Sequence, residues 1–350
     1  MSAPAVTRPS VVEAVARGRR RSASRRRVVV LTLAVLVVAG FAVTLMFGQT
    51  FYPPRDVVRV ILGEQVPGAS FTVGGLRLPR AVLAVVAGFS FGLAGVTFQT
   101  MLRNPLASPD IIGISWGASA AAAIAIVSLS LGGPQVSVLA IVSALAVALL
   151  VYILAFRDGV VGTRLILIGI GISAMLESVT SYVLSRAAEW DLQEALRWLT
   201  GSLNGTTWEQ TLPALVALVV LTPVLLAKSR DLSAMRLGDD TASALGVRVE
   251  RTRVTVIVAA VGLIAFATSA AGPIAFVAFL SGPIAARLVG AGGSLLVPAG
   301  FVGALLVLVA DFAGQFAFDV RYPVGVVTGV LGAPYLVYLI VRTHRAGGSL

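Results

Sequence analysis

Four charged residues lie within or at the start of long apolar runs, where a charge is unusual and could serve binding or ion transfer. Arg77 and Arg80 flank a proline at the start of a long apolar run, whereas Glu177 and Asp311 lie inside two other apolar runs. An exposed arginine fork suits the capture of a carboxylate through two parallel hydrogen bonds. A carboxylate inside a membrane is costly unless it faces water or a partner. We therefore expect Glu177 to line a pathway and Asp311 to have a structural, hydrogen-bonded role.

The composition excludes most catalytic chemistry. Apolar residues make up 57% of the chain, the mean hydropathy is +0.94 and charged residues make up 12%, as is typical of a polytopic membrane protein. There is no cysteine, and the one histidine is His344, so we expect no disulfide, no thiolate nucleophile and no metal site. The one lysine, Lys228, lacks the glycines of a phosphate loop, so this chain is not expected to hydrolyse ATP or to be an enzyme.

The net charge of +11 comes largely from the N-terminus, where eight arginines fall within the first 27 residues. Because these arginines precede a long apolar span, they follow the positive-inside rule, and we do not interpret them as a nucleic-acid site. The run from Val28 to Gly48 is longer than a usual signal-peptide core and no clear cleavage site follows it, so it is expected to remain as the first span. The expected domains are a basic cytoplasmic arm (1–27), a ten-span transmembrane domain (28–342) and a cytoplasmic tail (343–350).

Ten apolar runs are long enough to cross the hydrocarbon of a bilayer. The combined run near residue 272 is too long for one crossing, so we divide it at Ala271-Gly272-Pro273. An even count places both basic termini on one side, with 20 Lys and Arg residues there and seven on the other side. This asymmetry predicts cytoplasmic termini in an inner cell membrane. The predicted spans are 28–48, 81–101, 111–131, 136–156, 165–184, 211–228, 254–271, 273–289, 296–313 and 324–341.

The stretch from Leu76 to Gly117 reads as a helical hairpin through the bilayer. Gly88, Gly92 and Gly95 recur every three to four residues, so one stripe of the first helix lacks side chains and a neighbouring backbone can approach it closely. Gln99 lies near that stripe. The turn Arg103-Asn104-Pro105 then ends the helix, since proline restricts the residue before it and cannot donate to the preceding turn.

At these residues the chain resembles the FecCD-type permease family, the membrane subunits of ABC importers for iron-siderophores, haem and cobalamin. The resemblance implies an all-α type II ABC importer permease fold with about ten transmembrane helices. The chain departs from the family at Pro283-Ile284, at Gly314-Gln315 and at Arg321. The matching residues are Arg77, Pro79, Arg80, Gly88, Gly95, Gln99, 103–107, Pro109, Gly113, 117–118, 272–277, 282–283, Arg287, Gly290, Pro298, 303–304, 310–311, 323–325, Thr328 and 332–334.

The segment 229–253 is the longest predicted cytoplasmic connection, and it reads as two short helices around a glycine. Asp239 and Asp240 suit the first turn of the second helix, and Gly246 suits its C-terminal end. The order L-G-D-D-T-A-x-x-L-G-V is similar to the segment by which the family docks its ATPase. The resemblance implies an ATPase-coupling role for Leu237, Gly238, Asp239, Ala242, Leu245, Gly246 and Val247.

The resemblance also implies roles elsewhere. Arg77 and Arg80, with Arg321 as a further contact, would pair with acidic residues of an extracytoplasmic binding protein. Gly162 and Thr163, after Val161, would form an inner gate and Gln99 would belong to the pathway, whereas Arg103, Asn104, Pro105 and Asp311 would be structural. Glu177 has no counterpart in the family, and its expected place on the pathway rests on the cost of a carboxylate inside a span. The implied partners are ABC ATPase subunits that bind ATP and Mg, a binding protein, a second permease, a metal chelate and the lipid bilayer.

Two other classes remain open on the residues alone. An ion-coupled secondary transporter would use Glu177 and Asp311, but it leaves the 229–253 motif and the Arg103-Asn104-Pro105 turn unexplained. An intramembrane enzyme needs paired aspartates or a nucleophile with a base, and the apolar runs hold one aspartate and no histidine. Within the family, haem or cobalamin could replace a siderophore as cargo.

Overall fold

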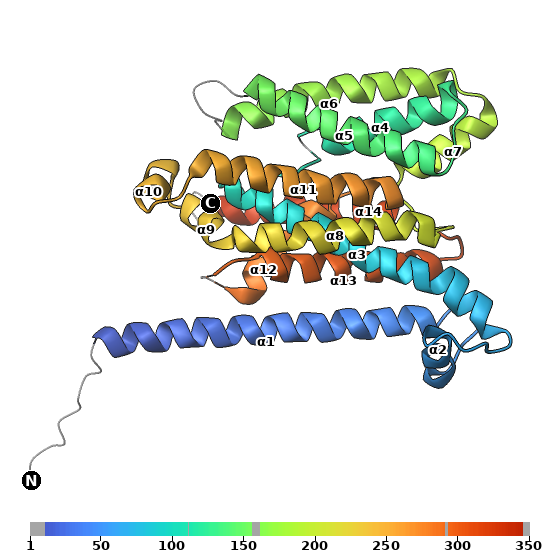
Figure 1. Cartoon of the computed structure of the whole chain (residues 1–350), viewed down its shortest axis with the longest axis horizontal. Coiled ribbons are helices and arrows are strands. Elements are labelled where there is room, and N and C mark those ends of the chain that lie inside the picture. The colour runs from blue at the N-terminus through green and yellow to red at the C-terminus, as the bar shows by residue number, and fades with distance from the viewer. Residues whose placement is uncertain (1–10, 111, 156–161, 291–292, 346–350) are drawn as a thin grey trace, which may run out of the picture.

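A computed structural model describes residues 11–110, 112–155, 162–290 and 293–345, and all regular secondary structure in this part of the chain is helical (Figure 1). Seven helices are long and apolar enough to cross a membrane, and three shorter apolar segments accompany them, so each of the ten predicted spans has a counterpart. The spanning elements are α1 (Val11–Met46), α3 (Leu78–Met101), α4 (Ile114–Ala123) continued by the π-helical η2 (Ile124–Ser128), α5 (Pro134–Ala155), α6 (Gly162–Ser185), α8 (Trp208–Ala227), α11 (Val249–Ala271), α12 (Val277–Val289), α13 (Leu296–Phe316) and α14 (Val324–Arg345). The short elements are α2 (Pro54–Ile61), the π-helical η1 (Ser70–Arg77), α7 (Glu189–Leu199), α9 (Ser229–Met235) and α10 (Asp239–Ala244).

The two ends of the bundle differ in what they carry. Figure 1 shows α9, α10, the start of α1 and the chain's C-terminal end at one end of the molecule, with α2 and α7 at the other. In the same view α4, α5 and α6 form an upper layer, α3, α8 and α11 lie in the middle, and α1 lies along the opposite side. The arginine-rich start of α1 therefore lies at the same end as the segment 229–253.

The glycines of α3 let two other helices approach at backbone distance. A Cβ added to Gly88 would lie 2.4 Å from the carbonyl oxygen of Gly303, and one added to Gly92 would lie 2.2 Å from that of Ala299. A Cβ on Gly95 would lie 1.9 Å from the carbonyl oxygen of Ala278. The predicted close approach is confirmed, and it makes α3 the central helix, packed on α13 and α12 through a side-chain-free stripe.

The first helix extends beyond its predicted span. It begins at Val11, inside the basic arm, and its 36 residues correspond to a length of about 54 Å. Arginine is a good helix former, so nothing in the arm stops the helix. Arg25 donates from Nε to the carbonyl oxygen of Leu288 (3.1 Å) and from Nη2 to that of Arg287 (3.2 Å), and thus places a cation at the C-terminus of α12, where the helix dipole favours it.

The division between the seventh and eighth spans is confirmed at Gly272. This residue has φ +70°, and α11 ends at Ala271. A Cβ on Gly272 would lie 2.4 Å from the carbonyl oxygen of Trp198 and 2.9 Å from Gly201 Cα, so the last turn of α7 and the loop after it pack directly on the break. The eighth span begins at Val277, four residues later than residue 273, because the intervening residues form an irregular turn in which Phe276 has φ +65°.

Candidate functional site

The segment 229–253 folds as the predicted pair of short helices, α9 and α10. Gly238, at φ +108°, separates them and Gly246, at φ +84°, ends α10, which are backbone conformations that glycine adopts without strain. Ala242, a residue of α10, is fully buried. Leu237 and Leu245 are 65% and 64% exposed, whereas Val247 is half-buried. The segment therefore presents two apolar side chains, one at each end of a compact helix.

Asp239, the first residue of α10, connects the segment to two spanning helices. Its Oδ2 lies 2.6 Å from Nη2 of Arg253 in α11, and its Oδ1 lies 3.7 Å from Nη2 of Arg103 at the end of α3. The Arg253 side chain is only 7% exposed and also binds Glu250. Charge pairing thus ties α10 to both α3 and α11.

The turn after α3 is fixed by its own side chains. Asn104 Oδ1 accepts a hydrogen bond from the backbone N–H of Leu106 (2.9 Å), which is the local turn that asparagine favours before proline.

Gln99 is buried and donates from Nε2 to the carbonyl oxygen of Phe279 (2.9 Å). The side chain of Gln99 fills the space above Gly282. In this structure Gln99 therefore packs α3 on α12, and the pathway role expected for it stays a prediction.

At the other end of the bundle, Arg80 is engaged within the chain. Its Nε and Nη2 donate to Asp311 Oδ2 (2.8 Å) and Oδ1 (2.7 Å), and its Nη1 donates to Asn204 Oδ1 (2.6 Å). Gln315 Nε2 donates to the same aspartate (3.0 Å). The expectation that Arg80 offers an exposed fork is wrong, because a buried aspartate already fills it.

Arg77 is also held by the protein itself. It donates to the carbonyl oxygens of Leu45 (2.9 Å), Met46 (3.1 Å) and Thr50 (2.7 Å), and its guanidinium lies 5.1 Å from the ring centroid of Tyr52. The expected exposed fork is wrong here too, since Arg77 ties η1 to the end of α1. Its exposed surface still contributes to a cavity of about 360 Å³ that Arg80 and Arg321 also line.

Arg321 differs from these two arginines. It lies in the loop before α14, it is exposed, and it forms no hydrogen bond or ion pair with any residue of the described ranges. Sequence reasoning named it only as a substitute contact. The structure makes it the arginine at this cavity whose guanidinium is available to a carboxylate.

A cavity of about 730 Å³ lies between α4, α6, α12 and α14, and Glu177 is on its wall. Asp110, which sequence reasoning did not single out, lines it from the connection between α3 and α4. Asp110 accepts hydrogen bonds from Ser115 Oγ (2.5 Å) and Ser108 Oγ (3.2 Å). Burial raises the pKa of Asp110, and the two serine hydrogen bonds act in the opposite direction. Its place after Pro109, within the helical hairpin, was the one available signal.

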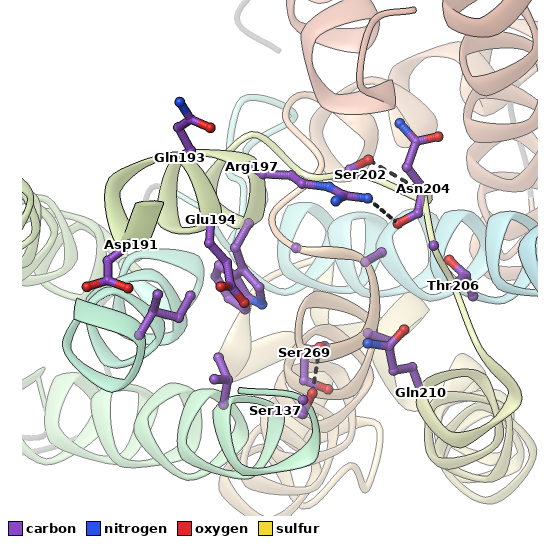
Figure 2. A pocket seen from close by; sticks show the side chains of 18 of the residues that line it. Ser137, Asp191, Gln193, Glu194, Arg197, Ser202, Asn204, Thr206, Gln210 and Ser269 are labelled. Atoms are coloured by element: carbon purple, nitrogen blue, oxygen red, sulfur yellow. Dashed lines mark hydrogen bonds between the residues drawn. The ribbon is translucent and has the colours of Figure 1, made fainter. Parts of the chain in front are cut away.

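A second cavity, of about 650 Å³, opens near α7 at the end opposite α10 (Figure 2). Arg197 Nη2 donates to the carbonyl oxygen of Asn204 (3.0 Å), whose N–H donates to Ser202 Oγ (3.1 Å). In Figure 2 Glu194 and Gln210 lie at this cavity from α7 and α8. The loop that fixes Arg80 through Asn204 therefore also forms this cavity's rim.

Only part of the predicted inner gate lies within the described residues. Gly162 and Thr163 form the first residues of α6, whereas Val161 lies outside the described residues. Across the described ranges no group of three or more His, Cys, Asp or Glu side chains is placed to hold a metal ion.

The fold and these sites define a polytopic helical permease of the membrane. A family model described as the FecCD transport family matches residues 35–342, and the chain belongs to this family. Its members are transporter permeases rather than enzymes, so the predicted family, fold and non-enzymatic nature are confirmed.

Curated relatives cover nearly the whole chain. The ferric enterobactin transport system permease protein of Escherichia coli (strain K12) is 38% identical over 333 residues, which are 92% of this chain and 98% of that protein. The achromobactin transport system permease protein of Dickeya dadantii (strain 3937) is 37% identical over 315 residues, covering 89% and 90%. Among solved structures, an inward-facing metal-chelate type ABC transporter superimposes with a TM-score of 0.80 at 27% identity and covers 89% of this chain and 98% of that one.

Proposed function

We propose that this chain is the membrane-spanning subunit of an ABC importer that takes up a metal chelate of the siderophore type. The observation that carries the proposal is the segment 229–253, in which Leu237 and Leu245 flank α10 as exposed apolar side chains. Two large apolar side chains on a small charged helix are a costly surface in water and suit a groove on a partner. The relatives transport ferric enterobactin and achromobactin by name, which supports an iron chelate as the cargo.

In this proposal the energy comes from another polypeptide. An ABC ATPase carrying ATP and Mg binds the segment 229–253, and its motion reaches the bundle through Asp239 and its two arginines. The two ion pairs of Asp239 connect α10 to the end of α3 and to α11, and both of these helices lie in the middle of the bundle. Binding protein outside and ATPase inside then bias the permease between outward-open and inward-open states.

The same proposal orients the chain in an inner membrane with both termini cytoplasmic. The arginines of α1 and the segment 229–253 lie at one end of the bundle, in keeping with the positive-inside rule (Figure 1). The opposite end carries Arg321 beside its cavity, where an acidic residue of a binding protein would dock. A second permease subunit, identical or a sister chain, would cover α6 and α14, whose exposed apolar residues include Leu167, Met175, Val330 and Val337.

The alternatives are weaker on this geometry. An ion-coupled transporter would use Glu177 and Asp311 as carboxylates that are free to exchange an ion, and Asp311 is already held by Arg80 and Gln315. Cobalamin remains an alternative cargo, because the cobalamin import system permease protein of Halobacterium salinarum is 36% identical over 274 residues, or 78% of this chain and 74% of that protein. Haem is a further alternative.

The test is ATP-driven uptake in proteoliposomes that contain this chain, its ATPase and its binding protein loaded with a ferric siderophore. Leu245→Asp is expected to abolish both uptake and co-purification of the ATPase, because a carboxylate would have to be buried in the docking groove. Leu129→Asp, an exposed leucine at the opposite end of the molecule, is the matched control and should retain both. Uptake that survives Leu245→Asp together with Leu237→Asp would contradict the proposal.

A further inference from the structure

The cavity of about 730 Å³ between α4, α6, α12 and α14 is lined by a charged residue, Glu177, that has no part in the proposed coupling to an ATPase. Glu177, Thr180, Ser181 and Leu184 line it with the spacing i, i+3, i+4 and i+7, so they form one face of α6. Glu177 lies inside α6, two turns before its C-terminal end, and it forms no hydrogen bond or ion pair with a residue in the described ranges. An unpaired carboxylate at this depth is retained only where water or a passing ligand solvates it.

The ionisable side chains on this wall are of one sign. Among the described residues that line the cavity, Glu177 and Asp110 are acidic and none is Lys, Arg or His. The oxygens of Asp110 are engaged by Ser115 and Ser108, whereas those of Glu177 are free. Low-dielectric walls focus the field of such a charge into the cavity, where it attracts cations and repels anions.

The rest of the wall suits an organic cation of moderate size. Trp116, Phe276 and Phe279 contribute aromatic surface, which attracts cations through its ring quadrupole. Hydroxyl groups of Ser119 and Ser181 offer hydrogen bonds beside them. The volume of about 730 Å³ falls within the range of small-molecule pockets, about 300 to 1,000 Å³.

We propose that Glu177 sets the charge of the cargo: the pathway favours a chelate that bears a protonated amine and disfavours one that carries a carboxylate in its place. This inference rests on the proposed function, because it concerns which chelates the permease passes. It assigns to α6 a selection by charge that acts in addition to the binding protein.

The natural absence of cysteine allows a direct measurement of the field. Ser181→Cys places a thiol one turn from Glu177, and its reaction rates with a cationic trimethylammonium methanethiosulfonate and an anionic sulfonate methanethiosulfonate are measured in the purified full-length chain. Each rate is divided by that of a free thiol in solution. The cation-to-anion ratio is expected to be about tenfold higher than in the same variant carrying Glu177→Gln. Glu209→Gln, an exposed acid at the start of α8, is the control and should leave the ratio unchanged. An equal ratio with and without Glu177 overturns the proposal.

Cargo selection is tested in proteoliposomes with the ATPase and binding protein. The pair of substrates is one linear ferric trihydroxamate with a free terminal amine and the same chelate after succinylation, which replaces the cation by a carboxylate. We expect the amine form to be transported about fivefold faster relative to the succinylated form in the wild type than in Glu177→Gln. Identical ratios in both proteins overturn the charge selection. If neither chelate is transported by the wild type, the proposed function fails instead, and the thiol measurement still decides the role of Glu177.

Discussion

Arg80 and Asp311 form a bidentate ion pair that joins α3 to α13, with both contact distances at or below 2.8 Å and the Asp311 side chain 7% exposed. The sequence separates these residues by 231 positions, and yet each satisfies the other's charge at the end of the bundle opposite α10. A buried pair of this kind contributes specificity of packing, and it strongly penalises the loss of either partner alone.

Asp311→Asn should therefore lower the free energy of unfolding by about 3 kcal/mol, because the guanidinium of Arg80 would remain buried without a counter-charge. The measurement is thermal or denaturant unfolding of the detergent-solubilised chain, followed by circular dichroism. The double variant Arg80→Met with Asp311→Leu removes both charges and should lose less stability than Asp311→Asn alone. The single variants Arg80→Met and Asp311→Leu complete the cycle. If the stability loss of the double variant equals the sum of the losses of these two single variants, the pair is not coupled.

Gly95→Ala should disrupt the bundle, because the new Cβ would meet the carbonyl oxygen of Ala278 at 1.9 Å and backbone cannot move aside cheaply. We expect a loss of stability of about 2 kcal/mol or more, seen as a lower unfolding temperature and a lower yield of monodisperse protein. Gly171→Ala in α6, where nothing lies within 4 Å of the added Cβ, is the matched control. That control should be neutral or slightly stabilising, since alanine favours a helix.

Asp239→Asn should uncouple ATP hydrolysis from uptake. The substitution keeps the size of the side chain but removes the charge that both Arg103 and Arg253 contact. We expect the ATPase to remain bound and active while chelate transported per ATP falls about fivefold. Both rates are measured in the same proteoliposomes.

Asp240→Asn is the natural control for Asp239→Asn, since Asp240 is the next residue of α10, is exposed, and has no ion pair within the described ranges. Unchanged coupling in Asp239→Asn, or equal loss in both variants, would remove the proposed linkage from α10 to α3 and α11.

Arg321→Glu should weaken docking of the proposed binding protein at least tenfold, because it replaces the available guanidinium at the cavity shared with Arg77 and Arg80 by a charge of the wrong sign. Surface plasmon resonance with the permease in nanodiscs measures the dissociation constant. Arg55→Glu, which alters an exposed arginine of α2 outside that cavity, is the control. If the two variants bind equally, the docking carboxylate is held elsewhere.

Much of this architecture could be predicted because membrane length and glycine spacing act locally. The spacing of Gly88, Gly92 and Gly95 was sufficient to predict a close helix approach, and Gly246 was sufficient to end α10. Which backbones meet that stripe was not predictable, since it depends on residues some 200 positions away.

The exposed fork expected of Arg77 and Arg80 was wrong for one physical reason. Each guanidinium finds its acceptors inside the chain: backbone carbonyls for Arg77 and an aspartate for Arg80. The docking of a binding protein near these residues stays a prediction. The presence of opposite charges near the ends of two spans was the signal available for the pairing of Arg80 with Asp311.

At Gly88, Gly92 and Gly303 the backbones of α3 and α13 lie directly against each other, so these positions hold no side chain that could rearrange between two states. Backbone packing of this kind favours movement of the two helices as one unit. The conformational change that moves cargo is then expected where helices meet through side chains that can change rotamer. The helices α4, α6 and α14 around the cavity lined by Asp110 and Glu177 meet in this way.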